Sequence, residues 1–560
     1  MSATSALRRG WWLALAGFFA LSAAFALGTP KQYGPDEPAH LMRAASAVRF
    51  EVSNYRDSRA MLGPAYLTPI WLPENWALWG DQTQVFTGHA GHPRCTGPHA
   101  AQLERNDAVS AREYAHSSSP CEVLASTYEG SYSPVYYLLV GAPSLFMGYN
   151  KGIYAMRLIS GLLSALLLAS AVRTAAESRA RRAAVLGVIA AATPSALFIS
   201  GVVNPSGAEI PAAVLTWTVL LSLALDPDPA LLRRRLIRLA AGCSLLMTAR
   251  TLGPVWVCVA FAVAALTAVL VRPELLRRLK RRPRLLPLNR TLAGHRVEVL
   301  GAGAVILVAA AVAIGWDLYA GGTSVTVKGH RAPLHVAALK ILGTTWFYIR
   351  QEIGQFGWGY QVSPVPIMLA GAALVAGLVL AAWAVAPRRM VGLLALVVAA
   401  ALFIGVPLNA PDYNTLDWIG RYQLPMFVAA PVLAGLLLGK YAPQALRGPR
   451  AQTRPVRLLR GAVRFAPWSF ALLMVVSLAG FYISLAMQYS GGYQNPMPVP
   501  VGWRPPTGWI PVSALCAAGV ALLTWLVLRA SLPARSAATQ DAAPLLTEKR
   551  PEERRPARRG

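Results

Sequence analysis

The segment Tyr33–His40 (Tyr-Gly-Pro-Asp-Glu-Pro-Ala-His) holds the residues best suited to chemistry. Asp36 and Glu37 are adjacent carboxylates, and His40 follows Asp36 by four residues, which on a helix places the two on one face. Such a cluster provides a general base or ligands for a divalent metal ion. A carboxylate beside a second carboxylate and low-dielectric lipid has a raised pKa, which suits a base. The alternative role is structural: Asp36 caps a helix that has Pro38 in its first turn, and the two roles are compatible.

Arginines at the ends of apolar segments supply the opposite charge. Arg157 lies four residues inside such a segment, where a charge is costly and needs a partner, so it either binds a phosphate or extends to the interface. Arg421 and Tyr422 begin a later apolar segment, and Arg250 lies in a similar position beside a short one.

The elements that must position these residues are membrane helices. The chain has 560 residues, of which 55% are hydrophobic and only 14% charged, and its mean hydropathy is +0.43. A helix needs about 20 apolar residues to cross a bilayer. Twelve apolar runs are candidate spans, and this count is accurate to about two. The run 237–250 is short and could form a broken span together with the next run. The twelve runs are 11–28, 153–172, 183–200, 208–225, 237–250, 253–271, 297–315, 364–386, 391–407, 423–438, 466–487 and 510–529.

The net charge of +28 reports orientation. If the N-terminus is cytoplasmic, alternation assigns 36 of the 53 Lys and Arg residues to the cytoplasmic side, a strong positive-inside pattern. We therefore expect both termini in the cytoplasm of an inner-membrane protein, with the residues suited to chemistry on the outer face. The apolar stretch 134–149 then lies at the outer interface and does not span. Nucleic-acid binding is excluded, because the basic residues are scattered over seven pieces.

The predicted fold is an all-α integral membrane protein with about 12 transmembrane helices and a large first extracytoplasmic loop. The first apolar run has an alternative interpretation as a cleaved signal peptide. The predicted segments are, in order, a cytoplasmic N-terminus and first span (1–28), an extracytoplasmic loop with the acidic motif and an interfacial helix (29–152), helices (153–315), a second extracytoplasmic loop (316–363), further helices (364–529) and a disordered basic cytoplasmic tail (530–560). We expect the basic tail to contact membrane lipids.

Two of the five cysteines, Cys95 and Cys121, lie in the first extracytoplasmic loop. A disulfide between them is expected in an oxidising compartment. The alternatives are free thiols or a metal site with His92 and His99, although the spacing matches no standard zinc pattern.

Six short motifs in a fixed order resemble the GT-C superfamily of polyprenyl-phosphate-sugar glycosyltransferases, and in particular a bacterial multi-pass family grouped with it. They extend over roughly residues 10–440. The motifs are Pro35–His40, Ser133–Tyr137, Arg157–Ser160, Thr193-Pro194 with Val203–Pro205, Gly354 with Phe356–Trp358, and Gly420–Tyr422 with Pro425.

This resemblance implies an outer-face active site that moves a monosaccharide from a polyprenyl phosphate to an acceptor hydroxyl with inversion. Asp36 would be the base, and Glu37 and His40 would support it or hold a divalent ion. The resemblance places the lipid phosphate at Arg157, Arg421 and Tyr422, and the other substrate groups at Tyr137, Asn204 and Trp358.

Two motifs depart from the family pattern, which often has an acid after the Asn of the third-span turn and reads Gly-Trp-Leu-Asp near the second loop. This chain has Asn204–Ser206 and Gly357–Tyr360, which places more weight on Asp36 and Glu37. The mechanism requires no cofactor and admits a divalent cation. The acceptor would be a cell-envelope glycan, a secreted protein or a peptide natural product. The alternatives are a lipid-linked-glycan translocator and a non-catalytic membrane assembly protein.

Overall fold

The computed structural model describes most of the chain. The described residues are 3–51, 68–73, 76–77, 83–85, 121–179, 181–274, 294–320, 333–357, 363–405, 419–447, 452–462, 465–492 and 499–531.

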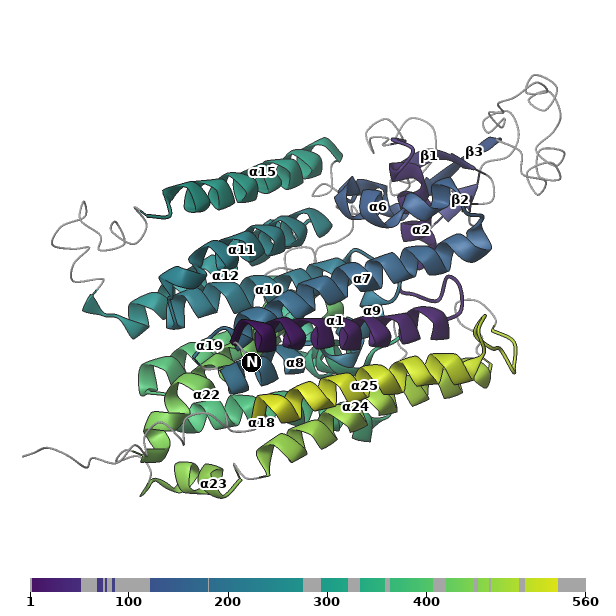
Figure 1. Cartoon of the computed structure of the whole chain (residues 1–560). Helices are drawn as coiled ribbons and strands as arrows, with labels where there is room; N and C mark the ends of the chain where they lie inside the picture. Colours follow the sequence, from purple (N-terminus) through teal and green to yellow (C-terminus); the bar gives the residue numbers. More distant parts are fainter. Residues whose placement is uncertain are drawn as a thin grey trace, which may run out of the picture.

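Within these residues, nine helices are long and apolar enough to cross a membrane, and they run side by side in one bundle (Figure 1). Each exceeds 18 residues and has few charges, which is what a span needs. They are α1 (Ala3–Gly28), α7 (Tyr149–Ala176), α10 (Ser206–Leu225), α12 (Gly253–Val271), α15 (Arg296–Ala320), α18 (Val365–Val385), α21 with α22 (Gly420–Phe427 and Ala429–Arg447), α24 (Ala466–Ser490) and α25 (Trp509–Ser531).

Three of the twelve expected spans differ from simple membrane helices. The 183–200 segment forms α8 (Arg181–Ala191) and α9 (Pro194–Ser200), which are bent by 63°. Proline cannot donate a backbone hydrogen bond, so the helix ends there, and the Thr193 hydroxyl accepts from the Ala196 N–H to start α9. The described chain thus has nine candidate spans, or ten with this bent pair.

The other two differences follow from composition and length. The short segment 237–250 belongs to α11 (Pro229–Ala249), whose first half carries four arginines and is too polar to pass as a span. The segment 391–407 forms α19 (Arg388–Phe403), which has only 16 residues.

A small mixed unit covers one end of the bundle (Figure 1). It contains α2 (Glu37–Ala47) and an antiparallel sheet of order β1-β3-β2, formed by β1 (Thr68–Pro73), β2 (Thr83–Val85) and β3 (Glu122–Thr127). Ala125 of β3 lies opposite Ile70 and Val85, and the buried Ile70 and Ala125 belong to a second hydrophobic core. The expectation of an all-α protein was therefore wrong for this unit.

Short helices complete this end of the molecule. They are η2 (Tyr128–Ser131), α6 (Pro134–Val140) and η3 (Ala142–Leu145), so the stretch 134–149 is no span, as expected. The remaining helices are α16 (Leu334–Gly343), α17 (Thr345–Gly354), which contacts α9 and α21, and α23 (Arg454–Ala462).

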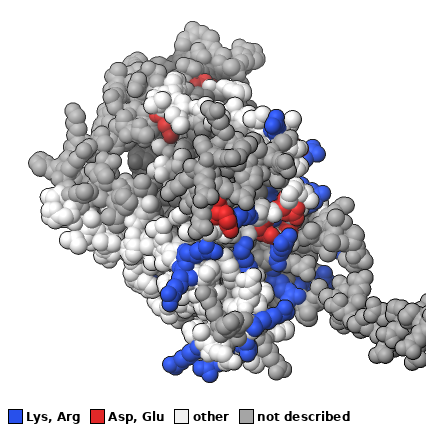
Figure 2. Space-filling view, turned by 90° about the vertical axis from the view of Figure 1, so that its left-hand side faces the viewer, with Lys and Arg blue, Asp and Glu red and all other residues white. Residues whose placement is uncertain are grey.

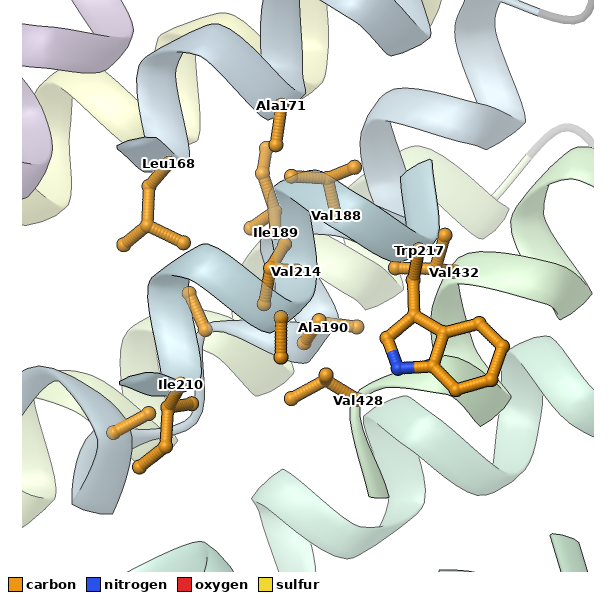
Figure 3. Close-up of a cluster of buried hydrophobic side chains, with 14 of the residues drawn as sticks. Leu168, Ala171, Val188, Ile189, Ala190, Ile210, Val214, Trp217, Val428 and Val432 are labelled. Carbon is orange, nitrogen blue, oxygen red and sulfur yellow. The ribbon is translucent and has the colours of Figure 1, made fainter. Parts of the chain in front are cut away.

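The bundle core lies around α10, whose apolar stretch is 94% buried. Its residues Ile210, Val214 and Trp217 meet apolar side chains of α7, α8 and α22 (Figure 3). Trp217 also donates through Nε1 to the carbonyl of Pro425 at 2.9 Å, which fixes α10 against α21. This packing holds α21, and with it Arg421, in place at the end of the bundle.

Candidate functional site

Asp36 lies at the N-cap position of α2, where the chain leaves α1 and enters the mixed unit. Its backbone has φ 56° in the left-handed region, which is uncommon for a residue other than glycine. Its side chain makes no capping hydrogen bond. Instead, Oδ2 accepts from Nη2 of Arg421 in α21. Of the two expected roles, Asp36 keeps the capping position, but its carboxylate faces a cation from a distant helix.

Glu37 and Arg157 form a buried structural pair. Arg157 donates from Nε and Nη2 to the Glu37 carboxylate at 2.7 and 2.6 Å, and both side chains have no exposed surface. Its remaining three donors reach the carbonyls of Ala26, Thr29 and Pro30. Because all five N–H groups are used, Arg157 has none left for a phosphate.

The Glu37 carboxylate is likewise fully engaged in hydrogen bonds. It also accepts from the backbone N–H groups of Gly34 and Val203, each at 3.1 Å. The catalytic role expected for Glu37 and the phosphate-binding role expected for Arg157 are therefore corrected: the pair ties the loop after α1 to α7 and to the turn before α10.

His40 lies one turn after Asp36 and is joined by an acid that the sequence analysis missed, Glu129 of η2. His40 Nε2 lies 3.8 Å from Glu129 Oε1, while Nδ1 is 2.8 Å from the Tyr137 hydroxyl. Burial lowers the pKa of His40 to about 3 and raises the pKa of Glu129 to about 8. Near neutral pH the imidazole is thus uncharged, and the Glu129 carboxyl is largely protonated.

Asp36, His40 and Glu129 form an arrangement that could hold a divalent cation. One ligand atom from each lies within 4.8 Å of the others. His40 Nε2 and Glu129 Oε2 are buried and have no hydrogen-bond partner, which is what ligand atoms turned toward an ion would show. In the tautomer with the proton on Nδ1, this nitrogen donates to the Tyr137 hydroxyl and Nε2 keeps its lone pair for an ion, an arrangement typical of metal-binding histidines. One imidazole and two carboxylates suit zinc or manganese.

Two guanidinium groups lie beside this cluster. Arg250, directly after α11, donates to the Tyr132 hydroxyl at 2.7 Å and to the Ser206 hydroxyl at 2.9 Å. Its guanidinium lies 4.4 Å from the centre of the Tyr422 ring, and that of Arg421 lies 5.3 Å from the same ring. Tyr422 therefore holds both cations near Asp36.

A further acid, Glu209, lies in the first turn of α10. It is buried and interacts electrostatically with Arg250. Where the family pattern has an acid directly after the Asn, this chain places Glu209 one turn further on. Glu209 therefore adds a negative charge near the Arg250 guanidinium, which bonds Ser206 and Tyr132.

Three residues were predicted to contact the substrate: Tyr137, Asn204 and Trp358. Tyr137 is fully buried and orients His40. Asn204 is also buried; it donates to the carbonyl of Pro35 at 2.9 Å and so fixes the loop before Asp36. Both side chains thus hold other residues of the site in position, and their role as substrate contacts stays a prediction. Trp358 lies outside the described residues.

Only one of the two cysteines in the expected disulfide belongs to the described residues. Cys121 is disulfide-bonded, whereas its predicted partner Cys95 lies outside the described residues, as do His92 and His99. The three cysteines in or beside apolar helices, Cys243, Cys258 and Cys516, are free.

The comparisons with known proteins identify a family. No curated protein and no solved structure matches the chain significantly. A family model described as a predicted membrane protein, DUF2142, matches residues 19–428. This match extends from within the first span to the end of α21, and it includes Asp36, His40, Glu129, Arg250 and Arg421. The chain therefore belongs to the DUF2142 family of predicted membrane proteins.

Proposed function

We propose that the protein is a membrane glycosyltransferase that moves a monosaccharide from a polyprenyl phosphate to an acceptor hydroxyl. The observation that carries the proposal is the pairing of Asp36 with Arg421, with the guanidinium of Arg250 against the same Tyr422 ring as that of Arg421. A carboxylate beside two guanidiniums offers both a base and a binding site for a phosphate leaving group. Because the cluster lies where membrane helices end, a lipid-linked donor could reach it from the bilayer.

In the proposed reaction, Asp36 accepts the proton of the acceptor hydroxyl. The acceptor oxygen forms a bond to C1 of the sugar while the bond from C1 to the phosphate oxygen breaks, so the configuration at C1 inverts. The electron pair of the broken bond stays on the polyprenyl phosphate. Arg421 and Arg250 stabilise the charge that develops there. When the donor phosphate binds, Arg421 is shared between it and Asp36, which aligns base and leaving group.

A divalent cation fits the same site. Asp36, His40 and Glu129 would hold it, and it would add positive charge next to the phosphate. Burial leaves His40 neutral and therefore able to bind a metal at neutral pH. Glu129 would have to lose its proton to bind the ion as a carboxylate.

The proposal also covers location and partners. The donor is a polyprenyl-phosphate sugar in the inner membrane, and the acceptor is a cell-envelope glycan, a secreted protein or a peptide natural product. The sequence contains no Gly-x-x-x-x-Gly-Lys-[Ser/Thr] motif for binding a nucleotide, which favours a lipid-linked donor.

The experiment compares lipids from cells that lack this chain with lipids from cells complemented by the wild type, by Asp36→Asn or by Asp228→Asn. Asp228 is a matched control: it also occupies an N-cap position, its side chain bonds the Ala230 N–H, and asparagine caps a helix as well as aspartate does. We expect a polyprenyl-phosphate sugar, detected by mass spectrometry, to accumulate without the chain and with Asp36→Asn, but not with Asp228→Asn.

Once that donor is identified, transfer is measured with purified protein in vesicles. Loss of a general base should lower the rate of Asp36→Asn by about 10²–10⁴-fold. Transfer at the wild-type rate would contradict the proposal. Movement of labelled lipid across the vesicle membrane with an unchanged head group would favour a translocator instead.

A further inference from the structure

An apolar groove lies at the end of the bundle opposite the candidate site. Four helices form its walls: α8, α18, α22 and α24. Its lining includes Leu186, Leu378, Leu438 and Phe470, and its volume is about 760 Å³. Pockets that enclose small ligands have volumes of about 300–1,000 Å³, so the groove has room for part of a lipid.

The lining of the groove changes from apolar to basic where α8 begins. Arg179 and Arg182 both line it there and are exposed. Arg179 also lies 3.6 Å from Asp226, so one acid shares its charge. Figure 2 faces this end of the molecule and shows Lys and Arg side chains gathered over its lower part, with a smaller group of Asp and Glu beside them.

The helix α23 adds an independent feature at the same end. It carries Arg454, Arg457 and Arg460 at three-residue intervals, and Leu458 is 67% exposed. Arg460 donates to the carbonyl of Leu446, which lines the groove. A short helix with several arginines and an exposed leucine is typical of a segment that lies on an anionic membrane surface.

We propose that this groove binds an anionic phospholipid, with an acyl chain against the apolar walls and the phosphate at Arg179 and Arg182. Two observations favour this occupant: the apolar lining ends at arginines, and α23 presents further arginines beside the groove. The positive-inside pattern predicts that this end faces the cytoplasm, where anionic lipids attract basic segments. The proposal is independent of the glycosyltransferase function, because the groove shares no residue with the candidate site.

A glycine in the groove wall provides a sharp test. A Cβ at Gly377 would have no atom within 4 Å, and the residue lines the groove, so Gly377→Trp should fill it without a clash at the backbone. Gly392 of α19 is equally open but lies outside the groove lining, so Gly392→Trp is the matched control. For the charge, Arg182→Gln is compared with Arg389→Gln, which removes an exposed arginine from the same end of the molecule.

The full chain is purified in detergent, stripped of lipid, and mixed with phosphatidylglycerol or with phosphatidylcholine of the same acyl chains. Bound lipid is counted by native mass spectrometry, and the melting temperature is followed in parallel. We expect wild type and Gly392→Trp to retain phosphatidylglycerol in preference to phosphatidylcholine. Gly377→Trp should retain neither. Arg182→Gln should weaken phosphatidylglycerol binding about fivefold, in line with the attraction of one basic residue to an anionic surface, whereas Arg389→Gln should leave it unchanged.

Three results would overturn the proposal. The first is equal retention of the two lipids by the wild type. The second is retention by Gly377→Trp that matches Gly392→Trp. The third is a dimer of the stripped protein that Gly377→Trp converts to a monomer, which would assign the groove to a second copy of the chain. If Gly377→Trp does not fold, the comparison of the two lipids and the two arginine variants still decides the question.

Discussion

Asp36 and Glu37 are adjacent in the chain, yet their side chains serve different parts of the molecule. The left-handed backbone at Asp36 turns its carboxylate toward Arg421, whereas Glu37 begins α2 and reaches Arg157 in α7. A left-handed aspartate costs some free energy and persists only where its surroundings hold it. The bond from Asn204 to the carbonyl of Pro35 provides such a restraint. The left-handed backbone therefore lies at the partly exposed carboxylate and not at the fully buried one.

The buried pair should be essential for folding. Glu37→Gln leaves the Arg157 charge without its counter-ion, and breaking a buried pair costs about 3–5 kcal/mol. We expect a clear fall in melting temperature for Glu37→Gln, measured on purified protein in detergent. Asp36→Asn should cause a smaller fall, because the Asp36–Arg421 pair keeps some solvent exposure whereas the Glu37–Arg157 pair has none. A Glu37→Gln protein that melts like wild type but transfers no sugar would restore a catalytic role for Glu37.

Glu129 should make stability depend on pH. Its pKa is raised by burial from 4.5 in the unfolded chain to about 8 in the folded protein. The folded state thus holds the proton more tightly, so this contribution is complete below pH 4.5 and is lost as the pH rises toward about 8. In metal-free buffer, Glu129→Gln should show a smaller fall of melting temperature over this range than wild type. Equal slopes for the two proteins would contradict the pKa shift.

Residues of the site that are close in sequence were predictable, and those brought together by folding were not. The spacing of Asp36 and His40 on one helical turn predicted their proximity. Glu129 is 93 positions from Asp36, and no local pattern connects the two. Arg157 was misassigned for the opposite reason: a charge in an apolar segment signals a need for partners, but the sequence does not show that backbone carbonyls and Glu37 meet that need.

At the scale of elements, the contact between α8 and α22 depends on two glycines. A Cβ at Gly187 would lie 2.5 Å from the carbonyl oxygen of Pro431, and one at Gly435 would lie 2.5 Å from that of Ala183. The backbones are therefore in direct contact, as is usual where small residues meet in membrane helices. This contact holds α8 up to the break at Thr193, and hence the position of α9.

Gly187→Ala and Gly435→Ala should both lower stability. Each added methyl group must separate two backbones, and overpacking costs about 1–3 kcal/mol. Gly392→Ala is the control, because its Cβ meets nothing within 4 Å; we expect it to be neutral or slightly stabilising, since alanine favours helix more than glycine. Thermal unfolding of the three variants in detergent tests this, and equal melting temperatures would show that the helices can separate without cost.

Helices were easier to predict than strands for a physical reason. Each of the twelve apolar segments lies wholly or largely in helix, because a long apolar run signals its own structure. The strands β1 and β3 have six residues each and pair across more than forty positions of the first loop, Thr68 with Thr127 and Pro73 with Glu122. These segments form strands because they pair with each other, and not because their own residue pattern favours a strand. The bend at Pro194 was visible as a proline, yet its angle depends on packing against α17.

At the scale of the whole molecule, the two ends of the bundle differ in chemistry. The mixed unit lies at one end and the basic helix α23 at the other (Figure 1). The first end holds Asp36, His40 and Glu129, and the second holds the groove with Arg179 and Arg182. Burial also varies across the bundle: the apolar stretch of α10 is 94% buried and that of α15 only 11%. The helix α15 thus exposes most of its surface to lipid, whereas α10 packs on all sides against neighbouring helices of the bundle.

The difference in charge between the two ends predicts the orientation in the membrane, which cysteine labelling can measure. In a Cys258→Ser background, Val501→Cys places a thiol at the end that holds the candidate site, where the native residue is 84% exposed. Arg389→Cys places one at the basic end. Because basic segments stay in the cytoplasm, a membrane-impermeant maleimide should label Val501→Cys in intact cells and Arg389→Cys only after permeabilisation. Labelling of Arg389→Cys alone in intact cells would place Asp36 on the cytoplasmic side, where nucleotide-linked donors are plentiful, and the reason for favouring a lipid-linked donor would then be lost.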